Sequence, residues 1–165
     1  MDSRHSTLTP MSDESFFKAQ YPKLLSKQDV PEVSNHALAA KNVRTMLAQH
    51  FPGRKFSVKS STYANGSSLR VTWSDLDLEN DAAVELGKQV QAIADRFAYG
   101  DFNGMYDSYT YATGERRAFT ELFGAVKYTF ADAEPRSELA LAKYKEEMLE
   151  KSLPKRKPKS QGSRF

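Results

Sequence analysis

The sequence predicts an α+β fold, a two-layer sandwich in which helices cover one face of a single antiparallel sheet. Two observations indicate this class. Apolar residues recur every three or four positions in two segments, as on the buried stripe of a helix, and they alternate with polar residues in the segments between, as in half-buried strands. The predicted element order is α-β-β-α-β-β-α, with a four-stranded, mainly antiparallel sheet. Strands with a single apolar face predict that the other face of the sheet is open.

The first predicted helix spans residues 36–50. Ser34 or Asn35 precedes it as N-cap, and Pro52 and Gly53 follow its end. Its predicted buried stripe consists of Ala39, Ala40, Val43, Met46, Leu47 and Phe51.

A β-hairpin follows. Residues 55–59 and 68–74 alternate between apolar and polar side chains, and Asn65-Gly66 lies between them. Because this dipeptide tolerates positive φ angles, it favours a tight turn joining two antiparallel strands.

The remaining elements are predicted in the order helix, strand, strand, helix. Apolar residues at helical spacing from Ala83 to Phe97 predict a second helix, and the acids of 75–81 suit its N-terminus. A turn at 100–104, a strand at 105–111 and a turn at Thr113-Gly114 follow. The next predicted strand is 125–130, with Val126, Tyr128 and Phe130 on one face. A last helix runs from Pro135 to about Leu153.

The predicted domain organisation has four parts. Residues 1–33 form a partly disordered N-terminal extension, because prolines interrupt it and few side chains are apolar. Residues 34–131 form the α+β domain, 132–153 the C-terminal helix and 154–165 a disordered tail. Within the extension, the residues expected to dock on the domain or on a partner are Phe16, Phe17, Tyr21, Leu24 and Leu25.

The charge is concentrated at the C-terminus. Five of the 24 Lys and Arg residues lie in 154–165, which leaves 19 basic residues against all 21 acidic residues in the rest of the chain. The tail is therefore basic while the body is close to neutral. We expect its Lys155, Arg156, Lys157 and Lys159 either to follow a nucleic-acid backbone or to keep the chain in solution.

Several classes of chemistry are disfavoured. The absence of cysteine removes disulfides, thiolate metal sites and a cysteine nucleophile, and it suits a reducing compartment such as the cytoplasm of a host cell. No apolar run is long enough to span a membrane. The sequence has no HExxH motif and no phosphate-binding glycine loop. No metal, cofactor or catalytic residue is therefore predicted.

The open sheet face is the first candidate binding surface. Alternation places Lys55, Lys59, Arg70 and Lys127 on it, among serines and threonines. Such a face suits phosphates, and it equally suits a solvated sheet whose charges oppose aggregation.

Tyrosines are the second candidate. Tyr106 and Tyr109 lie in the aromatic segment 99–111, where exposed rings would stack on bases and buried rings would fill the core.

Several blocks resemble large polyvalent protein-associated domain 29. They are 39–44 (AAKNVR), 51–61 (FPGRKFSVKSS), 66–75 (GSSLRVTWSD), 99–109 (YGDFNGMYDSY) and 123–130 (FGAVKYTF). The likeness covers about residues 37–131. It implies a mobile genetic element of phage or plasmid origin, with a role in DNA transfer or in countering host defence, and it brings no catalytic residues.

The sequence thus favours a non-enzymatic interaction protein of a mobile element that binds DNA or RNA, or a host defence protein. Two alternatives stay open. One is a small enzyme that uses Asp101 and Asp107 with Arg70 or Tyr109, because burial beside aromatic rings raises a carboxyl pKa. The other is a module that only assembles a larger complex. The sequence does not indicate an oligomeric state.

Overall fold

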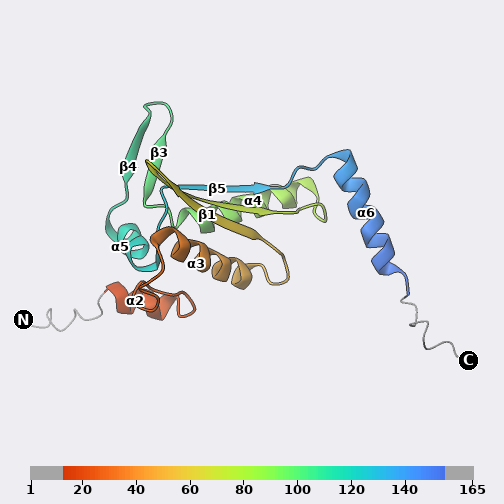
Figure 1. The fold of residues 1–165 in the computed structure, drawn as a ribbon. Coiled ribbons are helices and arrows are strands. Elements are labelled where there is room, and N and C mark those ends of the chain that lie inside the picture. The colour runs from red at the N-terminus through yellow and green to blue at the C-terminus, as the bar shows by residue number, and fades with distance from the viewer. Residues whose placement is uncertain (1–12, 155–165) are drawn as a thin grey trace, which may run out of the picture. The chain divides into compact units, whose positions relative to one another are not determined.

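The computed structural model describes residues 13–154, and the chain divides into two compact units, Met1–Ala133 and Glu134–Phe165. Among the described residues there are five helices and five strands, which confirms the α+β class (Figure 1). In chain order they are α2 (Asp13–Gln20), α3 (Asn35–His50), β1 (Ser57–Tyr63), β2 (Gly66–Trp73), α4 (Asn80–Asp95), β3 (Gly100–Asn103), β4 (Ser108–Tyr111), α5 (Gly114–Phe123), β5 (Tyr128–Ala133) and α6 (Glu138–Ser152).

The strands form two sheets, so the prediction of one four-stranded, mainly antiparallel sheet is wrong. The larger sheet has the order β1-β2-β5, in which β1 and β2 are antiparallel while β2 and β5 are parallel. β3 and β4 pair only with each other, as a separate hairpin. Residues 100–103, which were predicted as a turn, form a strand instead. This strand pairs with β4 and satisfies its hydrogen bonds. The turn follows β3, and Asp107 in it has φ +50°.

The β1–β2 hairpin and the predicted helices are present. Tyr63 pairs with Gly66, so the hairpin loop is Ala64-Asn65, one residue before the predicted pair. In the second unit, Ser137 caps α6 by accepting a hydrogen bond from the Ala140 backbone N–H at 3.0 Å. No residue of α6 is buried. No helix in residues 13–154 is long and apolar enough to cross a lipid bilayer.

Helix α5 was not predicted. Its buried residues Phe119 and Phe123 lie four apart, and Gly124 ends it with φ +96°. Gly124 also lies against the first turn of α3, where a Cβ would stand 2.5 Å from the Ala39 backbone nitrogen. Glycine is therefore required there for both conformation and space.

Helices α3 and α4 pack on the same face of the three-stranded sheet (Figure 1). Beneath them the strands bury Val58, Leu69, Val71 and Trp73, while Lys59 and Arg70 on the opposite pleat are exposed. The sheet thus has one covered face and one open face, because its side chains alternate between the core and the solvent.

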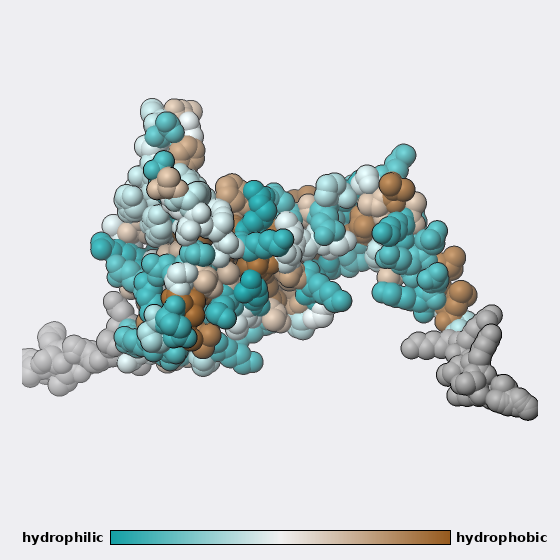
Figure 2. Space-filling view, in the orientation of Figure 1, coloured by the Kyte–Doolittle hydropathy of each residue, from teal (hydrophilic) through white to brown (hydrophobic). Residues whose placement is uncertain are grey.

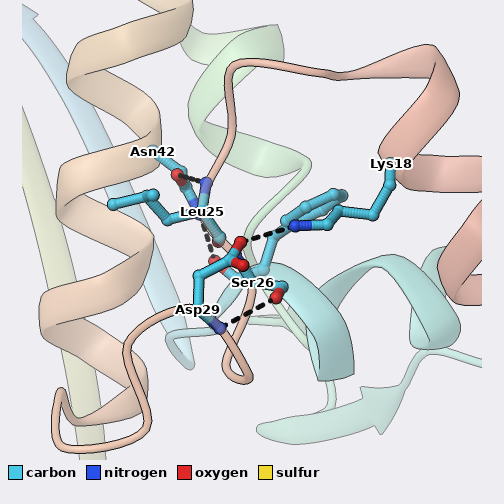
Figure 3. Close-up of polar contacts among 6 residues, drawn as sticks. Lys18, Leu25, Ser26, Asp29 and Asn42 are labelled. Atoms are coloured by element: carbon cyan, nitrogen blue, oxygen red, sulfur yellow. Dashed lines mark hydrogen bonds and ion pairs between the residues drawn. The ribbon is translucent and has the colours of Figure 1, made fainter.

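The segment that precedes α3 packs into the same core. Phe17 and Leu24 are 2% and 3% exposed. Asn42 of α3, fully buried, accepts a hydrogen bond from the Leu25 backbone N–H at 2.8 Å and donates to the Leu25 and Phe123 carbonyls at 2.8 and 2.9 Å (Figure 3). One side chain therefore joins α3 to this segment and to the end of α5.

A polar side chain covers the free edge of β5. The Ala131 backbone N–H donates to Gln91 Oε1 of α4 at 3.1 Å, and Gln91 Nε2 donates to Asp95 at 2.7 Å. Thr129 also donates to Asp95, at 2.5 Å. The edge amide is thus satisfied from within the fold.

Candidate nucleic-acid interface

The open face of the three-stranded sheet presents three rows of side chains. The strand register aligns them as Ser61–Ser68–Tyr128, Lys59–Arg70–Phe130 and Ser57–Thr72–Asp132. Each row runs across β1, β2 and β5. We use "open face" for these nine residues. Hydroxyls, cations and aromatic rings alternate on it, with one carboxylate.

Arg70 lies at the centre of the open face. Its guanidinium carbon lies 4.6 Å from the centroid of the Phe130 ring, and it forms an ion pair with Asp132. These contacts position the guanidinium beside Phe130 and Asp132, while 53% of the side chain stays exposed.

The β3–β4 hairpin has two chemically different faces. The pairs Gly100–Tyr111 and Phe102–Tyr109 lie on one face, and Asp101–Thr110 and Asn103–Ser108 lie on the other. The hairpin projects from the body of its unit (Figures 1 and 2). One of its faces is thus aromatic and the other polar.

Rings link the hairpin to the open face. Tyr109 and Phe102 lie 5.9 and 6.1 Å from Tyr128, between ring centroids. Tyr99 lies 5.8 Å from both Tyr109 and Tyr111, and its ring is nearly parallel to that of Tyr111, at 11°. We call these five residues, Tyr99, Phe102, Tyr109, Tyr111 and Tyr128, the aromatic track.

Tyr109 anchors the track. Its hydroxyl donates to the Lys127 carbonyl at 2.8 Å, and burial raises the pKa of this phenol well above its ordinary value. The neutral hydroxyl is therefore a permanent donor at physiological pH. Gly100 makes room for the ring, because a Cβ there would stand 2.3 Å from Tyr109 Cε1.

Lys127 places a cation beside the track. Its Nζ lies 5.1 and 5.5 Å from the Tyr109 and Tyr128 ring centroids and donates to the Asn65 carbonyl at 3.3 Å. The ammonium thus lies where the hairpin meets the sheet, within reach of both surfaces.

Much of this aromatic surface faces solvent. Phe102 is 51%, Tyr111 64% and Phe130 40% exposed. Exposed rings beside cations match the two groups that a single-stranded polynucleotide presents, because bases stack on the rings and phosphates pair with the cations.

A comparison with known protein families decides the relationship of the chain. The model of large polyvalent protein-associated domain 29 matches residues 34–137. The chain belongs to this family. The match begins at α3 and includes the β3–β4 hairpin and all three strands of the larger sheet. No curated protein and no solved structure matches the chain.

Within this family domain, the structure places Lys59 and Arg70 on the open face, as predicted. Lys55 is exposed and precedes β1. Lys127 was expected on the open face and instead precedes β5, at the hairpin junction. Lys155, Arg156, Lys157 and Lys159 lie outside the described residues.

The alternation of β5 is opposite to the prediction. The strand begins at Tyr128, and Val126 lies before it in an isolated bridge with Ala98. Thr129 faces α4, and Phe130 faces solvent. The residues that pattern reasoning missed are therefore Tyr128 and Phe130. The small Thr129, Ala131 and Ala133, alternating with them, were the signal that the other side of this strand fits beneath a helix.

The two predicted tyrosines have different environments. Tyr106 is 74% exposed in the hairpin turn, next to Met105 at 83%. Tyr109 is half-buried inside the track. Only Tyr109 therefore has a fixed position in the surface.

The residues of the enzyme alternative do not converge. Asp101 forms an ion pair with Arg116 at 2.8 Å on the polar face of the hairpin, opposite Tyr109. Asp107 is exposed in the turn, and Arg70 is paired with Asp132. In residues 13–154, no group of three or more His, Cys, Asp or Glu side chains is arranged to hold a metal ion.

Proposed function

We propose that this chain is a non-enzymatic interaction protein of a mobile genetic element that binds single-stranded nucleic acid. Bases stack on Phe130 and on the exposed rings of the aromatic track, and phosphates pair with Lys59, Arg70 and Lys127. The single observation that carries the proposal is the continuity of exposed rings and cations from the hairpin onto the open face.

The exposed rings favour a single strand over a duplex. Stacking requires bases whose flat faces are accessible, and a duplex buries these faces against neighbouring base pairs. Phe102 and Phe130 expose about half of their surface, so each has room for a base.

The charges favour moderate, salt-dependent affinity. The open face and the junction together hold three cations, Lys59, Arg70 and Lys127, against the one carboxylate of Asp132. Few phosphates are neutralised by such a set, so stacking is expected to supply much of the binding free energy.

The test is fluorescence anisotropy with a labelled oligothymidine of about 20 nucleotides, across about 50 to 300 mM salt. We expect wild-type protein to bind and to lose affinity as salt increases. The double variant Phe102→Ala and Phe130→Ala should weaken binding by roughly tenfold or more, because each stacked base contributes about 1 to 3 kcal/mol.

The matched control is Phe16→Ala, which removes an equally exposed ring (45%) from α2. It should leave the oligonucleotide affinity unchanged. The proposal is wrong if the wild type binds no oligonucleotide at the lowest salt, or if the control and the double variant lose affinity equally.

A second candidate is binding of a host defence protein through the hairpin turn. Met105 and Tyr106 are the most exposed apolar residues there, at 83% and 74%, and aromatic residues and Met are enriched in protein interfaces. Nuclease-treated pull-downs from host lysate separate the two functions. A partner that survives nuclease and is lost in Met105→Ser with Tyr106→Ser, but is kept in Phe130→Ala, would favour this candidate.

A further inference from the structure

A cavity of about 480 Å³ lies at one end of the aromatic track. The base of the hairpin, α5, the start of α3 and the segment before α3 surround it. The residues that line it include Lys27, Asn35, Tyr99, Tyr111, Arg117, Thr120 and Glu121. Its volume is in the range of pockets that bind small organic molecules.

Two stacked tyrosines line one side of the cavity. Tyr99 and Tyr111 lie with their rings nearly parallel, and Tyr111 remains 64% exposed. Burial raises the pKa of Tyr99, so its hydroxyl stays protonated and able to donate. The exposed ring of Tyr111 offers a planar heterocycle a stacking surface here.

Polar groups stand around this wall. Arg117 donates through Nε to Glu121 at 3.0 Å, and 65% of its side chain is exposed. Within the part of the chain that the structure describes, no hydrogen bond engages the Lys27 ammonium or the Asn35 side-chain amide. The cavity thus offers two cations against Glu121, and one amide that both donates and accepts.

From this set we infer that the cavity binds a nucleoside monophosphate unit. The base stacks on Tyr111 and presents its hydrogen-bonding edge to Asn35, and the phosphate pairs with Lys27 and Arg117. An amide is suited to a base edge, since it matches a donor and an acceptor together, and a guanidinium is suited to phosphate oxygens.

The inference deepens the proposed function and rests on it where the strand is concerned. Tyr99 and Tyr111 belong both to the track and to the cavity wall, so a strand stacked on the track ends at this cavity. The unit bound there is either the terminal nucleotide of that strand or a free mononucleotide, because the two share the same chemistry.

The experiment uses the full chain, labelled with ¹⁵N, and adds AMP, CMP, GMP or UMP, with the corresponding nucleosides as probes that lack phosphate. We expect mononucleotides to shift the amide signals of residues 27, 35, 111, 117 and 120. Nucleosides should bind roughly tenfold more weakly, because the charge-assisted contacts to phosphate are lost.

The test variant is Lys27→Glu with Arg117→Glu. Its matched control is Lys41→Glu with Lys88→Glu, which makes the same charge change at exposed positions of α3 and α4. The test variant should lose the mononucleotide shifts, whereas the control should keep them. Tyr111→Phe should keep them as well, and Tyr111→Ala should weaken them by roughly tenfold, since only the alanine removes the stacking surface. Circular dichroism of each variant checks that it is folded.

The inference is overturned if mononucleotides leave these signals unmoved, or if the test variant responds as its control does. If mononucleotides bind while oligonucleotides fail to bind, the cavity stands and the proposed function fails. Competition by a 5′-phosphorylated oligonucleotide assigns the cavity to a strand terminus, and lack of competition assigns it to a free mononucleotide.

Discussion

Two aromatic clusters in the first unit have the same number of rings but differ in solvent exposure. The closed cluster consists of Phe17, Tyr21, Phe97, Phe119 and Phe123, with ring centroids 5.0 to 6.4 Å apart. Its four phenylalanines are at most 2% exposed. The aromatic track has similar ring spacings, yet Phe102 and Tyr111 are more than half exposed.

The difference lies in what surrounds the rings. Helices α2 and α5 enclose the closed cluster, so its rings contribute to stability through burial. The track lies on the β3–β4 hairpin, on Tyr99 just before it and on the open face of the sheet, whose side chains no described helix of the first unit buries. It consists mainly of tyrosines, whose hydroxyls remain compatible with water. The first cluster stabilises the fold and the second remains available for contact.

The largest expected effect follows from truncating one ring in each cluster. Phe119→Ala should lower the free energy of unfolding by about 3 to 5 kcal/mol, because it removes buried apolar surface and leaves a cavity. Phe102→Ala should change it by less than about 0.5 kcal/mol, as at other exposed positions. Urea unfolding followed by circular dichroism measures both values. Equal losses would show that the two clusters do not differ in this way.

A somewhat smaller loss is expected at the polar contact that attaches the closed cluster to α3. Asn42→Ala leaves three backbone groups of Leu25 and Phe123 without their partner, one of them buried and two partly buried, so it should cost about 2 to 4 kcal/mol. Urea unfolding gives the total. Thr45→Ala, which removes one exposed hydrogen bond of the same helix, is the control and should cost under about 1 kcal/mol. A loss at Asn42 no greater than that at Thr45 would contradict this assignment.

The smallest effect concerns pH. The hydrogen bond and ion pair from Lys18 lower the pKa of Asp29 to about 2, from the ordinary 3.8, with help from the Ser26 backbone N–H (Figure 3). Because the folded-state pKa is depressed, the stabilisation is fully present above pH 3.8 and is lost as the pH falls towards 2.

The measurement compares wild type with Asp29→Asn in urea at several pH values. The variant should be slightly less stable at neutral pH, and the two curves should converge towards pH 2. Glu32→Gln, an exposed change in the same segment, is the control and should show no such convergence. A stability difference that does not shrink as the pH falls from about 4 to 2 would contradict the role of this carboxylate.

Sequence reasoning succeeded where the spacing of apolar residues and the residues that begin or end an element indicate the same structure. The spacing of apolar residues and the Pro52-Gly53 stop define α3, and alternation of apolar and polar residues defines β2 and the start of β1. In the candidate site, Lys59 and Arg70 were placed correctly because their strands have clear apolar partners.

It failed where tertiary contacts decide the structure. Helix α5 has only ten residues, and its two buried phenylalanines are too few to define a helical stripe, so the sequence pattern left this segment unassigned. The alternation in residues 125–130 predicted a strand with Tyr128 and Phe130 on the same face as the buried Val126. The strand begins only at Tyr128, and Tyr128 and Phe130 lie on the open face instead. No local pattern reports that Lys127 reaches Asn65, which lies 62 positions earlier.

The Gln91 contact at the free edge of β5 has a consequence for behaviour at high concentration. An unpaired edge strand recruits strands from other molecules, and exposed rings such as Phe130 would add to that attraction. Since the amide of Ala131 already donates to Gln91, an incoming strand finds no free donor at the middle of this edge. A molecule that keeps aromatic side chains in water is in this way protected from adding strands to its sheet along β5.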